Sequence, residues 1–264
     1  MTSFALKIIA IVSMTLDHFA KIVGQGGLLQ LYSDPLSAMN SPDALRMTSF
    51  ILHLMEVLGR MAFPLFAFML AEGCAKTRSM PRYLGRLALF AVISEPFYYF
   101  AFGFEPSVAG LFGNLAQLRF TNVFFTLLLG VLAVYIYQKL TAKYGVKGWI
   151  IAGITAVFLS FAAEFFNTDY GAMGVLLIVA LYLTRGRRGV QCAVVALWAV
   201  ALYSGGYLLT PGLSGFEEVL GACLACIPIM LYNGERGRRM KWTFYVYYPA
   251  HLLVLTLIDR ALIG

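Results

Sequence analysis

Charged side chains are scarce in this sequence. Only 12% of its 264 residues are Asp, Glu, Lys or Arg, whereas 60% are hydrophobic. Soluble proteins average about 25% charged and about 45–50% apolar residues. The scarcity of charge excludes an ordinary soluble domain and indicates a protein that crosses a membrane several times.

Cysteine is also scarce, with four residues in the whole chain. Cys223 and Cys226 form a C-x-x-C pair, but no second pair or nearby histidine completes a metal-binding set. All four cysteines lie in or beside apolar segments, so we interpret them as small buried residues and predict no metal site. We also expect no cleaved signal peptide, because the amino-terminal region has one Lys and no A-x-A site follows the first apolar run.

The apolar residues fall into nine candidate spans, and we see no internal repeat of the kind found in many transporters. We therefore predict an all-α, polytopic bundle of about nine transmembrane helices that forms one domain over residues 1–264. About 20 residues cross the hydrocarbon core, so the sixth and eighth spans are short. The candidate spans are 4–23, 52–74, 83–102, 121–140, 147–166, 171–184, 190–210, 217–232 and 243–262.

The loop charges predict an orientation. Basic residues gather in alternate connections, near 76–86, 139–147, 185–188 and 236–241. Because cytoplasmic loops carry the excess of Lys and Arg, we predict a multi-pass protein of the bacterial inner membrane with a cytoplasmic amino terminus. The same rule accounts for the net charge of +7, so we predict no nucleic-acid partner. Acidic residues mark the other loops, namely Asp34, Asp43, Glu105, Asp169, Glu217 and Glu218.

The longest of these outer loops are 24–51 and 103–120. Both are rich in Gly, Pro, Asn and Ser, and we expect them to lack structure of their own. Long unstructured loops are often functional. An acceptor molecule is therefore expected to meet the protein there.

The first span is unusual because it carries Lys7, Asp17, His18 and Lys21. An ionisable residue inside a span costs roughly 2.5–3.5 kcal/mol. Lys7 and His18 lie on nearly the same helix face, about 16 Å apart along the axis. Asp17 is expected to pair with Lys21 at i+4, which leaves His18 in need of a partner from another helix.

Other ionisable residues fall at similar depths if the predicted orientation holds. Arg60, Glu95 and His251 are placed in one layer with His18, and Glu72 lies closer to the cytoplasm. Structural readings stay open for most of them. Glu56 would pair with Arg60, and Glu72 would pair with basic residues of the loops. Glu95 would serve the helix at Pro96, His251 would bond carbonyls freed by Pro249, and Lys7 would extend to the inner headgroups. Asn122, Glu164 and Asp169 are expected near the outer surface.

Acyl transfer suits this layer of residues. A histidine exchanges a proton near neutral pH, a cation stabilises an oxyanion or a phosphate, and carboxylates orient both. The inner basic loops would attract an anionic donor such as acyl-coenzyme A. The same residues would also suit the proton relay of a transporter, and the residues alone leave the two readings open. A structural subunit of a secretion or conjugation assembly is a third reading.

Six segments, in this order, resemble the TraX family. That family is known for a membrane enzyme that acetylates the amino terminus of F-type pilin, and it is similar to the wider acyltransferase-3 class. In that class an Arg or Lys, ten residues and a His mark the first span, as Lys7 and His18 do here. The segments are LKIIAIVSMTLDH (6–18), GRMAFPLFAFMLAEG (59–73), RLALFAVISEPFYYFAF (86–102), NVFFTLLLG (122–130), DYGAMGVLLI (169–178) and WTFYVYYPAHLLVL (242–255).

The resemblance implies a membrane-embedded acyltransferase with a catalytic role for His18 and with Lys7 on the donor side. We expect His18 to act as a general base or to carry the acyl group briefly as a nucleophile, and Asp17, Glu95 or His251 to tune it. The donor would be acetyl-coenzyme A or another acyl-coenzyme A. The acceptor would be an amine or a hydroxyl, on a pilin amino terminus or another surface protein or glycan met from the outer side. The alternative is a proton-coupled transporter of a small solute. Binding roles are assigned to Arg60, Glu72, Glu95, Asn122 and Asp169.

Overall fold

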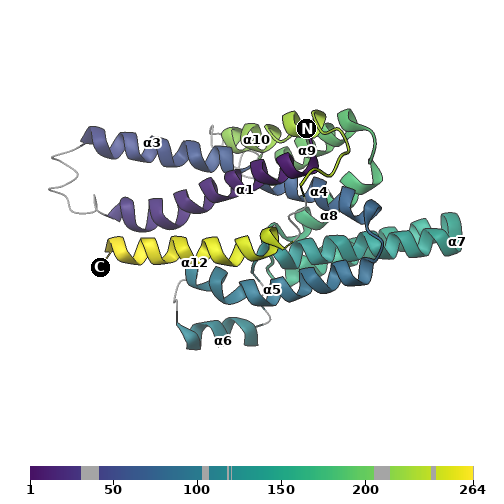
Figure 1. Cartoon of the computed structure of the whole chain (residues 1–264). Helices are drawn as coiled ribbons and strands as arrows, with labels where there is room; N and C mark the ends of the chain where they lie inside the picture. The colour runs from purple at the N-terminus through teal and green to yellow at the C-terminus, as the bar shows by residue number, and fades with distance from the viewer. Residues whose placement is uncertain are drawn as a thin grey trace. The chain divides into compact units, whose positions relative to one another are not determined.

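The computed structural model describes residues 1–30, 42–102, 107–117, 119, 121–204, 215–238 and 242–263. Every regular element within these residues is helical, as predicted (Figure 1). The chain forms two compact units. Unit 1 comprises Met1–Leu65, Phe100–Phe102 and Ala199–Gly264, and unit 2 comprises Phe66–Tyr99 and Gly103–Trp198. Whether the two units act as one domain stays a prediction.

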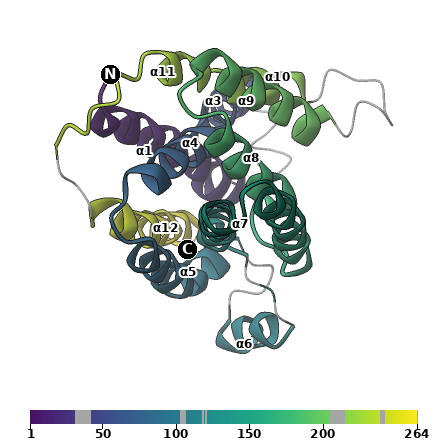
Figure 2. The same cartoon turned by 90° about the vertical axis from the view of Figure 1, so that its right-hand side faces the viewer.

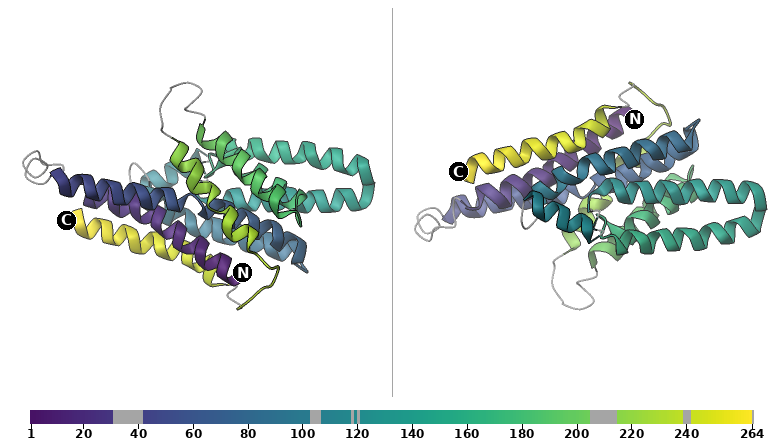
Figure 3. Two further views of the ribbon diagram at one scale, coloured as in Figure 1. Left: turned by 90° about the horizontal axis from the view of Figure 1, so that it is seen from above. Right: turned by 90° about the horizontal axis from the view of Figure 1, so that it is seen from below.

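Unit 1 is built around the first helix. Its main elements are α1 (Ser3–Phe19), the π-helix η1 (Ala20–Leu28), α3 (Pro42–Gly59), α10 (Phe216–Cys223), α11 (Cys226–Met230) and α12 (Thr243–Ile263). Helix α1 begins after Thr2, whose hydroxyl accepts a hydrogen bond from the backbone N–H of Ala5. Such a cap satisfies one of the free N–H groups at a helix start. Helix α1 packs against both α3 and α12 (Figures 1 and 3).

Helices α1 and α12 run in the same direction. The Nζ atom of Lys7 lies 4.6 Å from the centre of the Phe244 ring. Farther along both helices, the hydroxyl groups of Thr15 and Tyr247 are 2.7 Å apart. The predicted odd number of spans places the first and last helices in parallel, and the direction of α1 and α12 agrees with this. The absolute orientation in a membrane stays a prediction.

The predicted span 52–74 lies within a longer helical stretch that is divided in two. The helix begins at Pro42 and is interrupted by a turn at Arg60 and Met61, after which α4 (Ala62–Lys76) follows. Pro64 explains the interruption, because it has no N–H to donate to the carbonyl of Arg60 and its ring crowds that carbonyl.

The first helix also departs from the regular period that the sequence predicted to Val23. After Phe19 it continues as a π-helix, a rare element that is frequent at functional sites. Glycines allow this segment to pack closely. A Cβ atom on Gly24 would lie 2.4 Å from a Leu52 methyl of α3, and one on Gly26 would lie 2.5 Å from the Asp259 carboxylate of α12.

Unit 2 holds most of α4, α5 (Met80–Phe102) to Tyr99, α6 (Val108–Ala116), α7 (Val123–Phe165), α8 (Gly171–Leu183) and α9 (Arg188–Tyr203) to Trp198. Helix α7 is a hairpin of two helical arms that meet at Gly145 (Figure 3), where φ is 55°. Glycine reaches this positive φ without strain. Helix α8 packs on α7 (Figure 2). The arms correspond to the predicted segments 121–140 and 147–166.

Two helical stretches within the described ranges are long and apolar enough to cross a membrane, Pro42–Lys76 and Val123–Phe165. The second arm of α7 also exposes a row of large apolar side chains, each more than half exposed: Ile150, Ile154, Phe158, Phe161 and Phe165. Apolar surface of this extent suits contact with lipid. These features are consistent with a membrane protein, and the count of nine spans stays a prediction.

The two outer segments are not unstructured loops where they are described. The predicted loop 24–51 contains the end of η1 and most of α3, and 103–120 contains α6. Helix α6 is capped by Ser107, whose hydroxyl accepts the N–H of Gly110, and Pro42 opens α3, where its fixed φ suits a helix start. Asp34, Glu105, Arg239 and Lys241 lie outside the described residues.

Candidate active site

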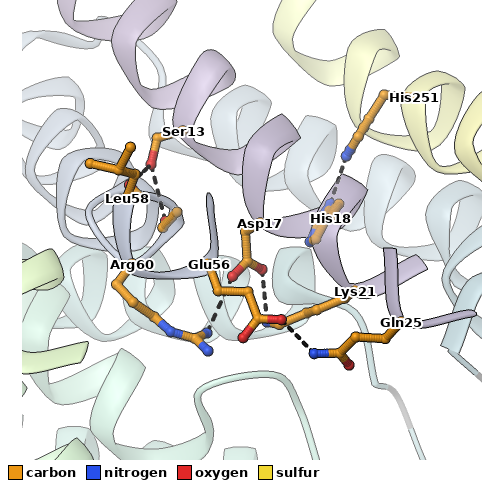
Figure 4. A network of polar contacts seen from close by, with 10 residues as sticks. Ser13, Asp17, His18, Lys21, Gln25, Glu56, Leu58, Arg60 and His251 are labelled. Atoms are coloured by element: carbon orange, nitrogen blue, oxygen red, sulfur yellow. Dashed lines mark hydrogen bonds and ion pairs between the residues drawn. The ribbon is translucent and has the colours of Figure 1, made fainter. Parts of the chain in front are cut away.

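The predicted partner of His18 from another helix is His251. The Nδ1 atom of His18 on α1 lies 2.7 Å from the Nε2 atom of His251 on α12 (Figure 4). The two rings are nearly parallel, with 10° between their planes. The side chain of His251 is buried and that of His18 is partly buried. Two histidines 233 residues apart in sequence thus form one hydrogen-bonded pair.

The backbone fixes which nitrogen of the pair is basic. The Nδ1 atom of His251 lies 3.0 Å from the carbonyl oxygen of Tyr247. A carbonyl only accepts, so this Nδ1 carries the hydrogen and the Nε2 of a neutral His251 is an acceptor. The Nδ1 of His18 must then donate to it. The Nε2 of His18 is left with its lone pair, so the neutral pair presents a base on His18.

Aromatic side chains hold the pair in place. The ring of Tyr247 stacks on His251 with 8° between the planes, and its hydroxyl reaches Thr15 of α1. The rings of Phe102 and Tyr248 meet His18 edge-on, with centroids 5.5 and 6.1 Å away. Sequence reasoning missed this support, although aromatic residues within one turn of His251 were visible in FYVYYPAH.

Asp17, the residue before His18, is the centre of a charged cluster. As predicted, Lys21 pairs with Asp17 at i+4, with 2.7 Å between Nζ and Oδ2. Arg60 adds a second ion pair at 3.3 Å to Oδ1 of the same carboxylate (Figure 4). Two cations, Lys21 and Arg60, thus flank the Asp17 carboxylate. Their N–H groups are suited to charge-assisted hydrogen bonds with an anionic group bound nearby.

The break between α3 and α4 places Arg60 in this cluster. The hydroxyl of Ser13 on α1 lies 2.8 and 3.0 Å from the carbonyl oxygens of Leu58 and Gly59, to which it donates. These are carbonyls at the end of α3, which a helix terminus leaves free. Gly59 has no room for a side chain, since a Cβ atom would lie 2.4 Å from that of Asp17. Sequence reasoning left open a pair of Arg60 with Glu56 and did not anticipate Asp17, although Gly59 and Pro64 mark the break.

Lys7 lies on the side of α1 that faces α12, as does His18. Its contact with the Phe244 ring and the contact of His18 with His251 are on the same helix pair. The prediction that Lys7 and His18 share a helix face is confirmed. A cation over an aromatic ring is stabilised by about 0.5–1 kcal/mol at exposed sites, so Lys7 is held beside α12.

The predicted site residues Glu95 and Asn122 form a separate buried network in unit 2. One Glu95 oxygen accepts from the backbone N–H and the hydroxyl of Thr121, both at 2.9 Å. The other oxygen accepts from the backbone and side-chain amides of Asn122, at 3.2 and 2.6 Å. Asn122 in turn caps α7 by accepting the N–H of Phe124. Through these four hydrogen bonds, the Glu95 carboxylate fixes the start of α7.

Glu72 and Asp169 also belong to unit 2. Glu72 pairs with Lys76 at 3.2 Å and with Arg188 at 3.3 Å, which confirms the predicted pairing with basic residues near the loops. Asp169 precedes α8, and its backbone N–H donates to the carbonyl of Thr121 at 3.1 Å. These contacts join the elements of unit 2.

The structure therefore sorts the predicted site residues into two groups. Unit 1 holds Lys7, Asp17, His18, Arg60 and His251. Within the described residues, His251 is the one member of this group that forms a hydrogen bond with His18. The proposed layer that would also include Glu95 stays a prediction. Within the described ranges no cluster of three His, Cys, Asp or Glu residues could hold a metal ion.

Similarity to known proteins extends over all the residues of this site. A family model described as "TraX protein" matches residues 3–259. The chain belongs to the TraX family. The resemblance predicted from six sequence segments is thus confirmed, and the TraX match includes every residue of the His18–His251 pair and the charged cluster.

This TraX-family chain is similar to the probable fimbrial assembly protein FimC, serogroup H1, of Dichelobacter nodosus. The two are 29% identical over 265 residues. The alignment covers 96% of this chain and 94% of that protein. No solved structure matches the chain.

Proposed function

We propose that this TraX-family chain is a membrane acyltransferase that moves an acyl group, acetyl in the simplest case, from acyl-coenzyme A to an amine or hydroxyl. The observation that carries the proposal is the direction of the hydrogen bonds in the histidine pair. The Tyr247 carbonyl, His251 and His18 form a chain of hydrogen bonds that ends at the free lone pair on Nε2 of His18. An imidazole held in one tautomer by a second group is the arrangement of a general base.

In the proposed reaction, Nε2 of His18 accepts the proton of the acceptor amine or hydroxyl. The acceptor nitrogen or oxygen forms a bond to the thioester carbonyl carbon, and the negative charge moves to the carbonyl oxygen. When that oxygen re-forms its double bond, the carbon–sulfur bond breaks. The coenzyme A thiolate then takes the proton from Nε2 of His18, which returns the base to its initial state.

His251 would act as a positioning residue in this reaction. While His18 is protonated, its Nδ1–H still donates to His251, so part of the positive charge is shared through the hydrogen bond. The Tyr247 carbonyl holds His251 in the accepting tautomer. His251 thus sets the tautomer and ring direction of His18 without touching the reacting atoms.

Anionic groups of the donor have two candidate sites in unit 1. The cluster of Asp17, Lys21 and Arg60 brings two cations to the residue that directly precedes His18. Lys7 supplies a further cation on the same side of α1, toward its start. We assign the thioester oxyanion to the cluster and a phosphate of coenzyme A to Lys7, because developing negative charge is stabilised by fixed cations.

The acceptor is proposed from family membership and from the relative named as a fimbrial assembly protein. A pilin or fimbrial subunit has a free amino terminus, and an amine is a suitable nucleophile for a thioester. The acceptor we would test first is therefore a pilin-type subunit, followed by a cell-surface glycan that offers a hydroxyl.

The test is transfer of radiolabel by the purified chain in proteoliposomes. Labelled acetyl-coenzyme A and a pilin subunit should give labelled pilin and free coenzyme A in equal amounts, and His18→Gln should give neither above background. Proton-dependent uptake of a solute without thioester turnover would instead support the transporter. A chain that does neither under these conditions with pilin or glycan acceptors contradicts the proposed function.

A further inference from the structure

Helix α3 carries a continuous polar row along one face. Its members are spaced three or four residues apart, which places them on one side of an α-helix. A different face of α3 exposes only large apolar side chains at the same depths: Met47, Phe50, Ile51 and Leu54. We call the polar set the α3 polar row, and it consists of Arg46, Ser49, His53 and Glu56 on α3 and of Arg60 in the turn that directly follows it.

Polar partners from three other elements meet this row. His53 contacts the carboxylate of Glu217 on α10. Glu56 accepts a hydrogen bond from the side chain of Gln25 on η1 (Figure 4). Arg60 reaches Asp17 on α1. The row therefore continues as a line of polar contacts from the surface of unit 1 to the residue beside His18.

Lys21 connects the inner end of this line to the histidine pair. It is ion-paired to Asp17, and it lies three residues beyond His18, where helix positions face the same side. Exposure falls along the line in the same direction. The side chains of His53 and Glu217 are 49% and 58% exposed, whereas those of Arg60 and Asp17 are 16% and 12% exposed.

The inner part of this polar row is incompatible with contact to lipid. Arg46 and Ser49 lie in the segment predicted to face outward, and from His53 to the end of α3 at Gly59 the helix rises about 9 Å within the predicted span. Each ionisable side chain facing hydrocarbon costs roughly 2.5–3.5 kcal/mol, and His53 is exposed. Polar residues at membrane depth are tolerated where they line a water-filled space.

We propose that the α3 polar row lines a hydrated path by which the polar end of the acceptor reaches His18. The row begins in the segment predicted to face outward, and Glu217 belongs to another segment predicted on that side. Charges of both signs alternate along the line, so it suits a polar amine or hydroxyl end rather than an acyl chain or a large polyanion. The assignment of the acceptor rests on the proposed function, whereas the presence of water does not.

Thiol accessibility tests the path in the full-length chain. Single cysteines would be introduced on the polar row (Ser49→Cys, His53→Cys) and on the apolar face at matched depths (Phe50→Cys, Leu54→Cys). A charged, membrane-impermeant methanethiosulfonate added from the outside reacts with a thiolate, which forms only in water. Row positions should react at least tenfold faster than apolar-face positions. The unsubstituted chain measures the background from its own four cysteines.

Equal rates on the two faces, whether fast or slow, would overturn the hydrated path. Ser49→Cys changes the side chain least, so it guards against misfolding of His53→Cys. The second arm measures acyl transfer after labelling: a bulky adduct at residue 49 or 53 should block transfer, and one at residue 50 should not. Labelling without loss of transfer would overturn the role in acceptor access. If the unmodified chain transfers no acyl group, the proposed function fails, while the labelling rates still decide whether the row faces water.

Discussion

Two polar groups in apolar surroundings, buried Glu95 in unit 2 and partly buried His18 in unit 1, differ in how completely their hydrogen bonds are satisfied. Glu95 in unit 2 accepts from four donors, and both oxygens are occupied. His18 in unit 1 uses Nδ1 in the bond to His251, and no hydrogen bond from the described residues reaches its Nε2. Both residues are equally conspicuous in an apolar sequence. The difference separates a carboxylate that holds helices together from an imidazole whose Nε2 lone pair accepts no hydrogen bond from the described residues.

The physical reason is the number of lone pairs on each group and the number of donors that bond to them. An ionised carboxylate offers about four acceptor positions, and the Thr121–Asn122 turn supplies a donor for each at the start of α7. A neutral imidazole offers one donor and one acceptor, and the Tyr247 carbonyl orders the pair so that the acceptor on His18 stays available. The predictions below test this contrast.

The largest expected effect is at His18. His18→Gln keeps much of the shape of the side chain but cannot accept a proton at neutral pH, so acyl transfer should fall by about 10²–10⁴-fold, the usual contribution of a general base. The measurement is the initial rate of radiolabel transfer, together with the thermal unfolding midpoint. The midpoint should stay near that of the unsubstituted chain. A rate within a fewfold of the unsubstituted chain would remove the contrast with Glu95.

Glu95 should show the opposite pattern, with a large loss of stability. Glu95→Ala leaves at least two buried N–H donors unsatisfied, each at about 1–3 kcal/mol, so we expect the free energy of unfolding to fall by about 3 kcal/mol. Unfolding in detergent, followed by helicity, measures this. The control is Glu164→Ala, which removes an exposed carboxylate that accepts only the N–H of Ala172 and should cost about 1 kcal/mol or less. Equal losses for the two variants would contradict a structural role specific to Glu95.

His251 should give a smaller effect on rate than His18. His251→Leu removes the acceptor that fixes the His18 tautomer. A hydrogen bond to a charged group contributes about 1.5–3 kcal/mol, so transfer should fall by roughly 10–100-fold. His251→Gln places an amide oxygen near the same position and should restore part of the rate. If the leucine and glutamine variants are equally slow, packing rather than hydrogen bonding explains the role of His251.

Lys7 should give the smallest effect, and it should appear in KM. Lys7→Ala removes a cation that is held by the Phe244 ring. The KM for acyl-coenzyme A is expected to rise by about fivefold, which corresponds to roughly 1 kcal/mol, with little change in kcat. Lys7→Arg keeps the charge and should keep most of the affinity. An unchanged KM in the alanine variant would take Lys7 out of the donor site.

Several features of the molecule follow from short-range sequence patterns. The apolar runs predicted most of the helices, because burial of backbone polar groups in an apolar medium requires internal hydrogen bonds. The spacing of Lys7 and His18, and of Asp17 and Lys21, predicted a shared face and an ion pair that the structure confirms. Helix geometry alone decides such relations, since they depend only on residues within a few turns of one another.

Local rules also explain where the predictions of regular structure were wrong. The break at Arg60 and Met61 follows from Pro64, and the helices inside the predicted loops follow from the Ser107 cap and from Pro42. These signals were present in the sequence but were weaker than the hydropathy pattern. The change to a π-helix after Phe19 is different, because it accompanies close packing of Gly24 and Gly26 against α3 and α12.

The sequence by itself determined the helical class, the family and the presence of a titratable group, His18, in an apolar segment. Only the tertiary structure decided its partner. His251, 233 residues away, is brought to His18 by the parallel packing of α1 and α12, just as the break in α3 brings Arg60 to Asp17. Periodicity fixes which face of a helix a side chain occupies. Which helix lies against that face is decided by packing over the whole unit, and that packing gives His18 its ordered tautomer.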